Sequence, residues 1–224
     1  MNDEKNEAES LVMEAWNEVV KEIEADNETN PEKAGDVSET WRKFWSEGDL
    51  VHRIVEIIKS KLAEKGNDSI KIHVQSYINK GYFANKVEKD AEGIIDCYKE
   101  LTISHQGKGL KTKVSPDIIL LKEKGNDREF LAFVEIKYIL GVGYSRMDSI
   151  EKDFEKLRCY SRQGIVAIGL LSFNPVIYAK TERGSKSEIK TYSMKKHELK
   201  EKITALKKEY KEIKYYDFYP SFLD

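Results

Sequence analysis

The chain has 224 residues, of which 40% are hydrophobic and 35% charged, so it can bury one sizeable core beneath a heavily charged surface. No apolar run reaches the roughly 18–20 residues that a membrane-spanning helix needs, and the acidic, polar first ten residues do not indicate a secretory signal. We therefore expect a cytoplasmic protein without a membrane partner, whose two cysteines, Cys97 and Cys159, are reduced thiols and form neither a disulfide framework nor a zinc site.

The charge is distributed unevenly along the chain. Residues 1–40 contain 13 acidic and 3 basic residues (net −10), whereas residues 41–224 contain 27 acidic and 35 basic residues (net +8). A basic body suits a polyanionic partner, and an acidic arm folded over that body would compete with the partner. The alternative is a soluble protein whose acidic first helix is solvated on its outer face.

Hydrophobic spacing predicts two helices in the first part of the chain. Residues 6–24 carry apolar side chains three and four positions apart, and a polar loop is expected over residues 25–37. An aromatic segment at Trp41, Phe44 and Trp45 is expected to dock on the main body. A second helix should follow Ser46, because Ser46 and Asp49 form a capping-box pattern. Its buried stripe comprises Leu50, Val51, Ile54, Val55, Ile58 and Leu62, and it should end at Lys65-Gly66-Asn67-Asp68.

The middle of the chain has strand character. Residues 70–74 alternate between apolar and polar side chains, whereas residues 76–112 follow no clear pattern. Residues 117–122 and 130–138 are predicted strands, and the turn residues 124–127 between them indicate a hairpin.

Helices and strands alternate again toward the end of the chain. Residues 147–162 are predicted to be helical, and the continuous apolar run 165–171 is typical of a strand buried on both faces. A short strand is expected at residues 176–178 and a lysine-rich helix at residues 193–212. The helix lysines either contact phosphate or are simply solvated. The aromatic residues after the helix either stack on bases or, as we expect, pack on the core.

The predicted hairpin carries a group of residues suited to catalysis. Side chains alternate between the two faces of a strand, so Glu135 and Lys137 point to the same side. The turn brings Asp117, at the start of the first strand, next to Glu135. Two carboxylates and an ammonium group should therefore converge at one end of the sheet. The alternative is an ordinary exposed Glu-Lys pair on a half-buried hairpin.

Phosphodiester hydrolysis needs this combination of groups. Asp117 and Glu135 can hold a hard divalent cation, most naturally Mg²⁺ with Mn²⁺ as a substitute, and the backbone carbonyl of Ile136 could add another oxygen ligand. A bound metal polarises the phosphate and lowers the pKa of a bound water. Lys137 can orient or deprotonate that water, or stabilise charge on the phosphate.

Residues 115–137 resemble the PD-(D/E)XK motif of the restriction-endonuclease-like superfamily. Ser115-Pro116-Asp117 leads into an apolar strand, and Glu135-Ile136-Lys137 ends the next one. The resemblance covers about half of the chain, residues 47–171. It implies an α/β fold with a mixed central sheet flanked by helices, and metal-dependent cleavage of nucleic acid, DNA in preference to RNA, as in restriction enzymes, resolvases and repair nucleases. The alternative is a nucleic-acid-binding or scaffold protein that keeps this fold without cleaving.

The family pattern also implies an acidic residue in the first core helix. At 100° per residue, Glu47 aligns with the inward stripe of that helix, whereas Glu56 faces solvent. Glu47 is therefore the fourth predicted site residue and metal ligand, although a favourable interaction with the helix N-terminus explains it equally well. Lys156, on the 147–162 helix, either contacts phosphate or belongs to a solvated face.

These elements predict three parts of the chain. Residues 1–40 form an acidic helical arm, residues 41–180 the nuclease core, and residues 181–224 a C-terminal helix with an aromatic tail packed on the core. The expected partner is nucleic acid, and the candidate assembly is a homodimer.

Overall fold

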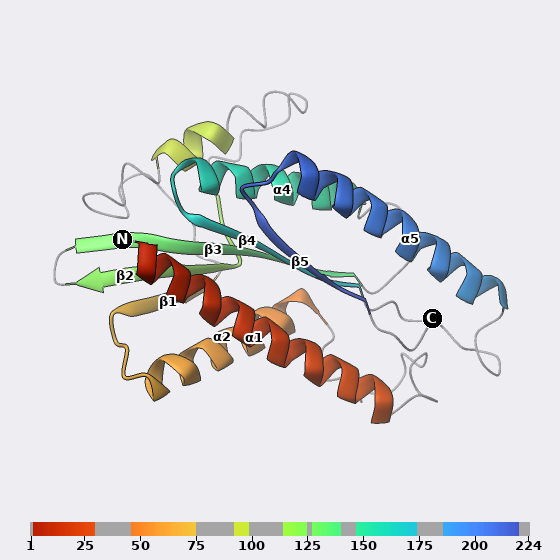
Figure 1. Ribbon diagram of the computed structural model, residues 1–224, viewed down its shortest axis with the longest axis horizontal. Helices are drawn as coiled ribbons and strands as arrows, with labels where there is room; N and C mark the ends of the chain where they lie inside the picture. The colour runs from red at the N-terminus through yellow and green to blue at the C-terminus, as the bar shows by residue number, and fades with distance from the viewer. Residues whose placement is uncertain are drawn as a thin grey trace.

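The computed structural model describes residues 2–29, 46–74, 92–98, 114–124, 127–139, 147–173 and 186–219. Within these residues, a five-stranded mixed sheet lies between two layers of helices (Figure 1). The α/β class and the mixed, helix-flanked sheet that the sequence predicted are confirmed. None of the described helices is long and apolar enough to cross a membrane.

The sheet has the strand order β1-β2-β3-β4-β5. Its first three strands are antiparallel, and β4 and β5 run parallel to β3. The predicted hairpin is therefore present, and its long second strand is central in the sheet. The strands are β1 (Ile70–Val74), β2 (Ile118–Lys124), β3 (Asp127–Ile139), β4 (Val166–Phe173) and β5 (Lys214–Phe218).

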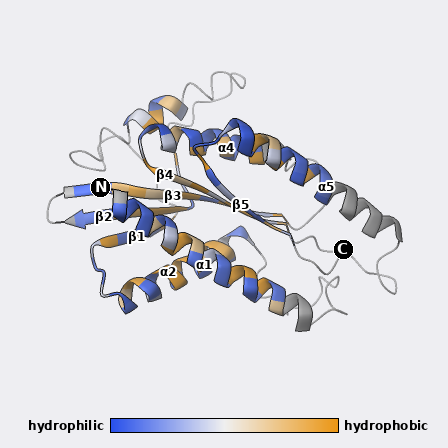
Figure 2. Ribbon diagram, in the orientation of Figure 1, coloured by the Kyte–Doolittle hydropathy of each residue, from blue (hydrophilic) through white to orange (hydrophobic). Residues whose placement is uncertain are grey.

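Each face of the sheet has its own hydrophobic core. The helices α1 (Asn2–Thr29) and α2 (Glu47–Glu64) cover one face, and α4 (Met147–Arg162), α5 (Lys186–Glu209) and the short helix 92–98 cover the other. The central strands are mainly hydrophobic, whereas the helices have one hydrophobic and one hydrophilic side (Figure 2). This pattern is expected when a sheet is buried on both faces by amphipathic helices.

The helix α2 begins and ends as its sequence predicts. The Ser46 hydroxyl accepts a hydrogen bond from the Asp49 backbone N–H (3.2 Å), and the Asp49 carboxylate accepts one from the Ser46 N–H (2.8 Å). The helix ends at Glu64, and Gly66 follows with a φ of +60°, a conformation that favours glycine. These caps hold Glu47 in the first turn of α2.

The helix α1 packs against the sheet and α2 as part of the hydrophobic core. It is longer than predicted, since it extends to Thr29 instead of ending near residue 24. Leu11, Trp16 and Ile23 are buried in the same core as α2 and the sheet. Its outer carboxylates form ion pairs with cations of the body, among them Glu22 with Arg53 (2.7 Å). Further pairs join Glu4 to Lys122, and Glu14 and Glu18 to Lys61.

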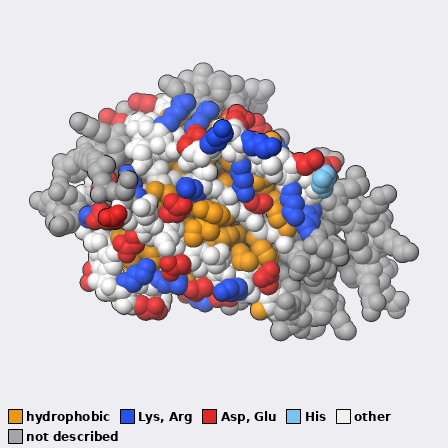
Figure 3. Space-filling view, viewed as in Figure 1, with side chains coloured by type: hydrophobic (Ala, Val, Ile, Leu, Met, Phe, Trp, Pro, Cys, Tyr) orange, Lys and Arg blue, Asp and Glu red, His pale blue; other side chains and the backbone are white. Residues whose placement is uncertain are grey.

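The burial of α1 and these ion pairs favour a helix packed permanently against the body over an acidic arm that competes with a polyanionic partner. On the side of the molecule seen in Figure 3, acidic and basic side chains are interleaved and do not form two separate patches.

The C-terminal region contains a strand that was not predicted. The helix α5 begins at Lys186, seven residues earlier than expected. Some of the aromatic residues after it belong to the strand β5. Tyr215 of β5 is buried and stacks on Phe154 of α4, with ring centroids 4.3 Å apart, so the expected packing of the tail on the core is confirmed for this residue. The aromatic segment 41–45, the expected strand 176–178 and most of residues 76–112 lie outside the described residues.

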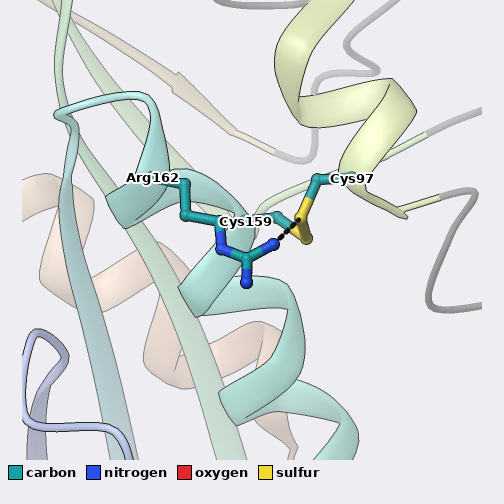
Figure 4. Close-up of a disulfide and its surroundings, with 3 residues drawn as sticks. All are labelled: Cys97, Cys159 and Arg162. Carbon is teal, nitrogen blue, oxygen red and sulfur yellow. Dashed lines mark hydrogen bonds between the residues drawn. A yellow bond between two sulfur atoms is a disulfide. The ribbon is translucent and has the colours of Figure 1, made fainter.

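The expectation of two reduced thiols is wrong, because Cys97 and Cys159 form a disulfide (Figure 4). The bond joins helix 92–98 to α4, with Cα atoms 5.6 Å apart, and the Arg162 guanidinium lies 3.8 Å from the Cys97 sulfur. The two residues are 62 positions apart, so only the packing of these helices brings them together. The disulfide also removes one support for a cytoplasmic location, since reducing compartments rarely keep such bonds.

Candidate functional site

The hairpin places Asp117 beside Glu135. Ile118 pairs with Val134, so the residue before Ile118 lies across from the residue after Val134. The Asp117 N–H donates to the Val134 carbonyl (3.1 Å), and the Ile136 N–H donates to the Asp117 carboxylate (2.6 Å). The first bond fixes the Asp117 backbone, and the second holds its side chain against the end of β3.

Glu135 is buried beneath α4, with 5% of its surface exposed. One carboxylate oxygen accepts a hydrogen bond from the Lys156 ammonium group and the other accepts one from the Tyr160 hydroxyl, each at 2.8 Å. Because a buried carboxylate is costly without such partners, α4 is needed to keep Glu135 inside the protein.

Lys137 lies between two helices, on the same side of β3 as Glu135. Its ammonium nitrogen is 3.6 Å from a carboxylate oxygen of Glu47 on α2 and 3.4 Å from one of Asp153 on α4. The Glu47 carboxylate also accepts a hydrogen bond from the Tyr138 N–H (3.4 Å). Glu47 therefore contacts the end of β3, as its inward position in α2 predicts.

Crowding and burial raise the pKa values of both hairpin carboxyls. Burial raises the pKa of Asp117 to about 6, although the Ile136 N–H opposes this, and the neighbouring Glu47 raises it further. Burial raises the pKa of Glu135 to about 7, although Lys156 opposes this, and Asp117 and Asp153 contribute in the same direction as burial. Both carboxyls therefore titrate close to neutrality.

The two lysines of the site remain ammonium groups at neutral pH. Burial by itself favours the neutral amine, but Asp153 and Glu47 leave the pKa of Lys137 above its usual value. Glu135 and Asp153 likewise raise the pKa of Lys156 against the effect of burial. Each lysine is thus kept charged by its carboxylate neighbours.

The fully ionised cluster has a charge of −2, from four carboxylates and two ammonium groups. The carboxylates are Glu47, Asp117, Glu135 and Asp153, and the ammonium groups are those of Lys137 and Lys156. Hard divalent cations prefer such oxygen donors, and Mg²⁺ is commonly held by one or two carboxylates together with water and phosphate oxygens. Among the described residues, no group of three or more His, Cys, Asp or Glu side chains is arranged to hold a metal ion. Asp117 and Glu135 supply oxygen donors of the kind that Mg²⁺ prefers, and Mg²⁺ binding by this pair stays a prediction.

The strand next to Glu135 leaves room for an aromatic side chain. Gly169 of β4 is the register partner of Glu135, and a Cβ atom at this position would lie 2.1 Å from the Tyr215 ring. Glycine therefore allows the ring to lie directly on the strand, where it also stacks on Phe154. This packing anchors α4, which provides the contacts to Glu135.

The structure brings Asp117, Glu135, Lys137 and Glu47 together at one end of the hairpin. For Ile136 it shows the backbone N–H holding Asp117, whereas the carbonyl as a metal ligand stays a prediction. Lys156 is only 25% exposed and ion-paired, so the solvated-face alternative for it is wrong.

Sequence reasoning missed two residues of α4, Asp153 and Tyr160. Asp153 contacts both lysines of the cluster, and Tyr160 contacts Glu135. A signal was present, because Asp153 lies on the same helical stripe as Ile150 and Leu157, where a carboxylate needs a buried partner.

The arrangement can bind a cation at its carboxylates and an anionic group at its ammonium groups. In comparisons with known proteins, no family model, curated protein or solved structure matches the chain.

Proposed function

We propose that the protein is a Mg²⁺-dependent nuclease that hydrolyses phosphodiester bonds of nucleic acid, with DNA as the preferred substrate. The observation that carries the proposal is the convergence of Asp117, Glu135 and Lys137 at one end of the β2–β3 hairpin. This is the arrangement expected from the resemblance to the PD-(D/E)XK motif, and the acidic residue expected on the first core helix, Glu47, lies beside it.

Asp117 and Glu135 would hold the metal, and Glu47 would complete the carboxylate shell. When bound, the metal supplies polarisation of the scissile phosphate and lowers the pKa of a coordinated water. Each Glu135 oxygen accepts one hydrogen bond, from Lys156 or Tyr160, and keeps a second lone pair with which it would bind the metal. A divalent cation would offset the charge of −2 in the fully ionised cluster.

Lys137 acts in this proposal as a fixed cation. Because its pKa is raised, it stays protonated at neutral pH and is poorly suited to accept a proton from water. An ammonium group beside the scissile phosphate instead stabilises the negative charge that develops during hydrolysis.

The proposal is tested with purified protein and plasmid, linear duplex and single-stranded DNA, and RNA, with Mg²⁺, Mn²⁺ or EDTA. We expect cleavage of at least one DNA form that EDTA stops, and Lys137→Ala should abolish the cleavage. Lys152→Ala is the matched control, because Lys152 is exposed on α4 and has no contact to the cluster that the structure describes. Cleavage that survives Lys137→Ala would place the active site elsewhere.

A second candidate is a nucleic-acid-binding protein that does not cleave. It is favoured by one observation: both oxygens of Glu135 already accept hydrogen bonds from side chains of α4. Under this alternative, DNA binds in the same assays but stays intact with every divalent cation, and Asp117→Asn leaves DNA affinity unchanged.

A further inference from the structure

One carboxylate of the cluster contacts both lysines. Asp153, on α4, has a side chain that is only 7% exposed. One of its oxygens lies 3.4 Å from the Lys137 ammonium nitrogen, and the other lies 3.5 Å from that of Lys156. A carboxylate this deeply buried is stable only when cations accompany it, so Asp153 and the two lysines depend on one another.

Each lysine shares Asp153 with a residue of the proposed metal shell. Lys137 also contacts Glu47 (3.6 Å), and Lys156 also contacts Glu135 (2.8 Å). Asp153 itself comes from α4, whereas Glu47 comes from α2 and Glu135 from β3. A change at Glu47 or Glu135 would therefore leave each lysine with Asp153 as an anionic partner.

We propose that Asp153 is a positioning residue that fixes the ammonium groups of Lys137 and Lys156 next to the carboxylates of the hairpin. The inference rests on the proposed function only for the substrate of the two lysines, which is the phosphodiester group of nucleic acid. Because Asp153 also offsets part of their positive charge, it weakens the attraction of the site for a phosphate. Its removal should therefore have opposite effects on binding and on cleavage.

Asp153→Asn separates these effects, because it keeps the shape of the side chain and removes its charge. In EDTA the variant should bind a short DNA duplex about threefold to tenfold more tightly, as expected when one anion beside two cations is lost. With Mg²⁺, kcat should fall about tenfold to a hundredfold, because the lysines are no longer held in place. A purely structural role for Asp153 would instead weaken binding and cleavage together.

Glu151→Gln is the matched control. Glu151 lies on the same helix, is half exposed, and pairs with Lys202 (3.2 Å) away from the cluster. The substitution removes the same charge from α4 and should leave both DNA affinity and kcat unchanged. If Glu151→Gln tightens binding as much as Asp153→Asn does, the effect comes from the total charge and Asp153 has no positioning role.

NMR of the lysine ammonium groups tests the inference without any activity. In the wild-type protein, the Nζ signals of Lys137 and Lys156 should be rigid and slowly exchanging, unlike that of the exposed Lys208. The assignment uses Lys137→Arg and Lys156→Arg. If both signals are as mobile as that of Lys208, the positioning role is excluded, even where Asp153→Asn fails to fold. If they are rigid but no DNA is cut, the proposed function fails and the positioning of the lysines stands.

Discussion

Tyr160 of α4 donates a hydrogen bond of 2.8 Å to the buried carboxylate of Glu135 on β3. Burial and the adjacent carboxylate raise the pKa of this tyrosine well above its usual value, so it acts as a donor at all ordinary pH values. The contact joins a helix to the end of the hairpin, through two residues that are 25 positions apart in the chain.

Tyr160→Phe should lower the free energy of unfolding by about 1.5–3 kcal/mol, the range for a hydrogen bond to a charged group. The ring remains and only the donor to Glu135 is lost. Urea denaturation measures the effect. Tyr216→Phe is the control, because the hydrogen bond from the Tyr216 hydroxyl to Glu9 is long, at 3.5 Å. Equal stability of Tyr160→Phe and the wild type would mean that the hydroxyl does not support Glu135.

Stability should decrease as pH rises from about 4 to about 7. The pKa of Asp117 is raised to about 6 and that of Glu135 to about 7, so between these values and the unfolded ones the native state binds more protons. The contribution of these groups is fully present below the unfolded pKa values and is lost as pH passes the folded ones. For Asp117 alone this amounts to about 3 kcal/mol.

Urea denaturation at pH 5 and pH 8 tests this pH dependence. Asp117→Asn and Glu135→Gln should each flatten it, because neither variant titrates at the changed position. Mg²⁺ should stabilise the wild type more at pH 8 than at pH 5, since metal and protons compete for the same carboxylates. A wild-type stability that rises between pH 5 and pH 8 would contradict the raised pKa values.

Reduction of the Cys97–Cys159 disulfide should destabilise the protein by about 4 kcal/mol, the chain-entropy estimate for a loop of this length. Thermal unfolding with and without dithiothreitol measures the effect. The double variant Cys97→Ala/Cys159→Ala is the control and should not respond to dithiothreitol. Alkylation of both cysteines in unfolded, unreduced protein would show that the bond is absent.

Trp16→Ala should lower the free energy of unfolding by about 3–5 kcal/mol, because Trp16 is buried between α1 and the rest of the core. Asn17→Ala, at the next and exposed position, is the control. A truncation that starts near Glu39 should for the same reason unfold the protein. If it instead folds and binds DNA more tightly at low salt, α1 is the competing arm that the charge asymmetry suggested.

Local sequence patterns determined several of the helices, strands and turns of this protein. The capping box at Ser46 and Asp49, the hairpin around residues 124–127, the helix 147–162 and the buried strand near 165–171 were predictable, because each depends on neighbouring residues or on a short period. The alternation of side chains along a strand placed Glu135 and Lys137 on one side of β3, and the hairpin placed Asp117 beside them. The position of Glu47 followed from the helical period together with the family pattern.

Only the tertiary structure decided which distant residues complete the cluster. Asp153 and Tyr160 meet Lys137 and Glu135 because α4 packs across β3, and no local period encodes that packing. The disulfide, the parallel pairing of β5 with β4, and the ion pairs of α1 have the same origin. Burial then raises the pKa values of Asp117 and Glu135 toward neutrality, because the cost of a charge depends on every element that excludes water from it.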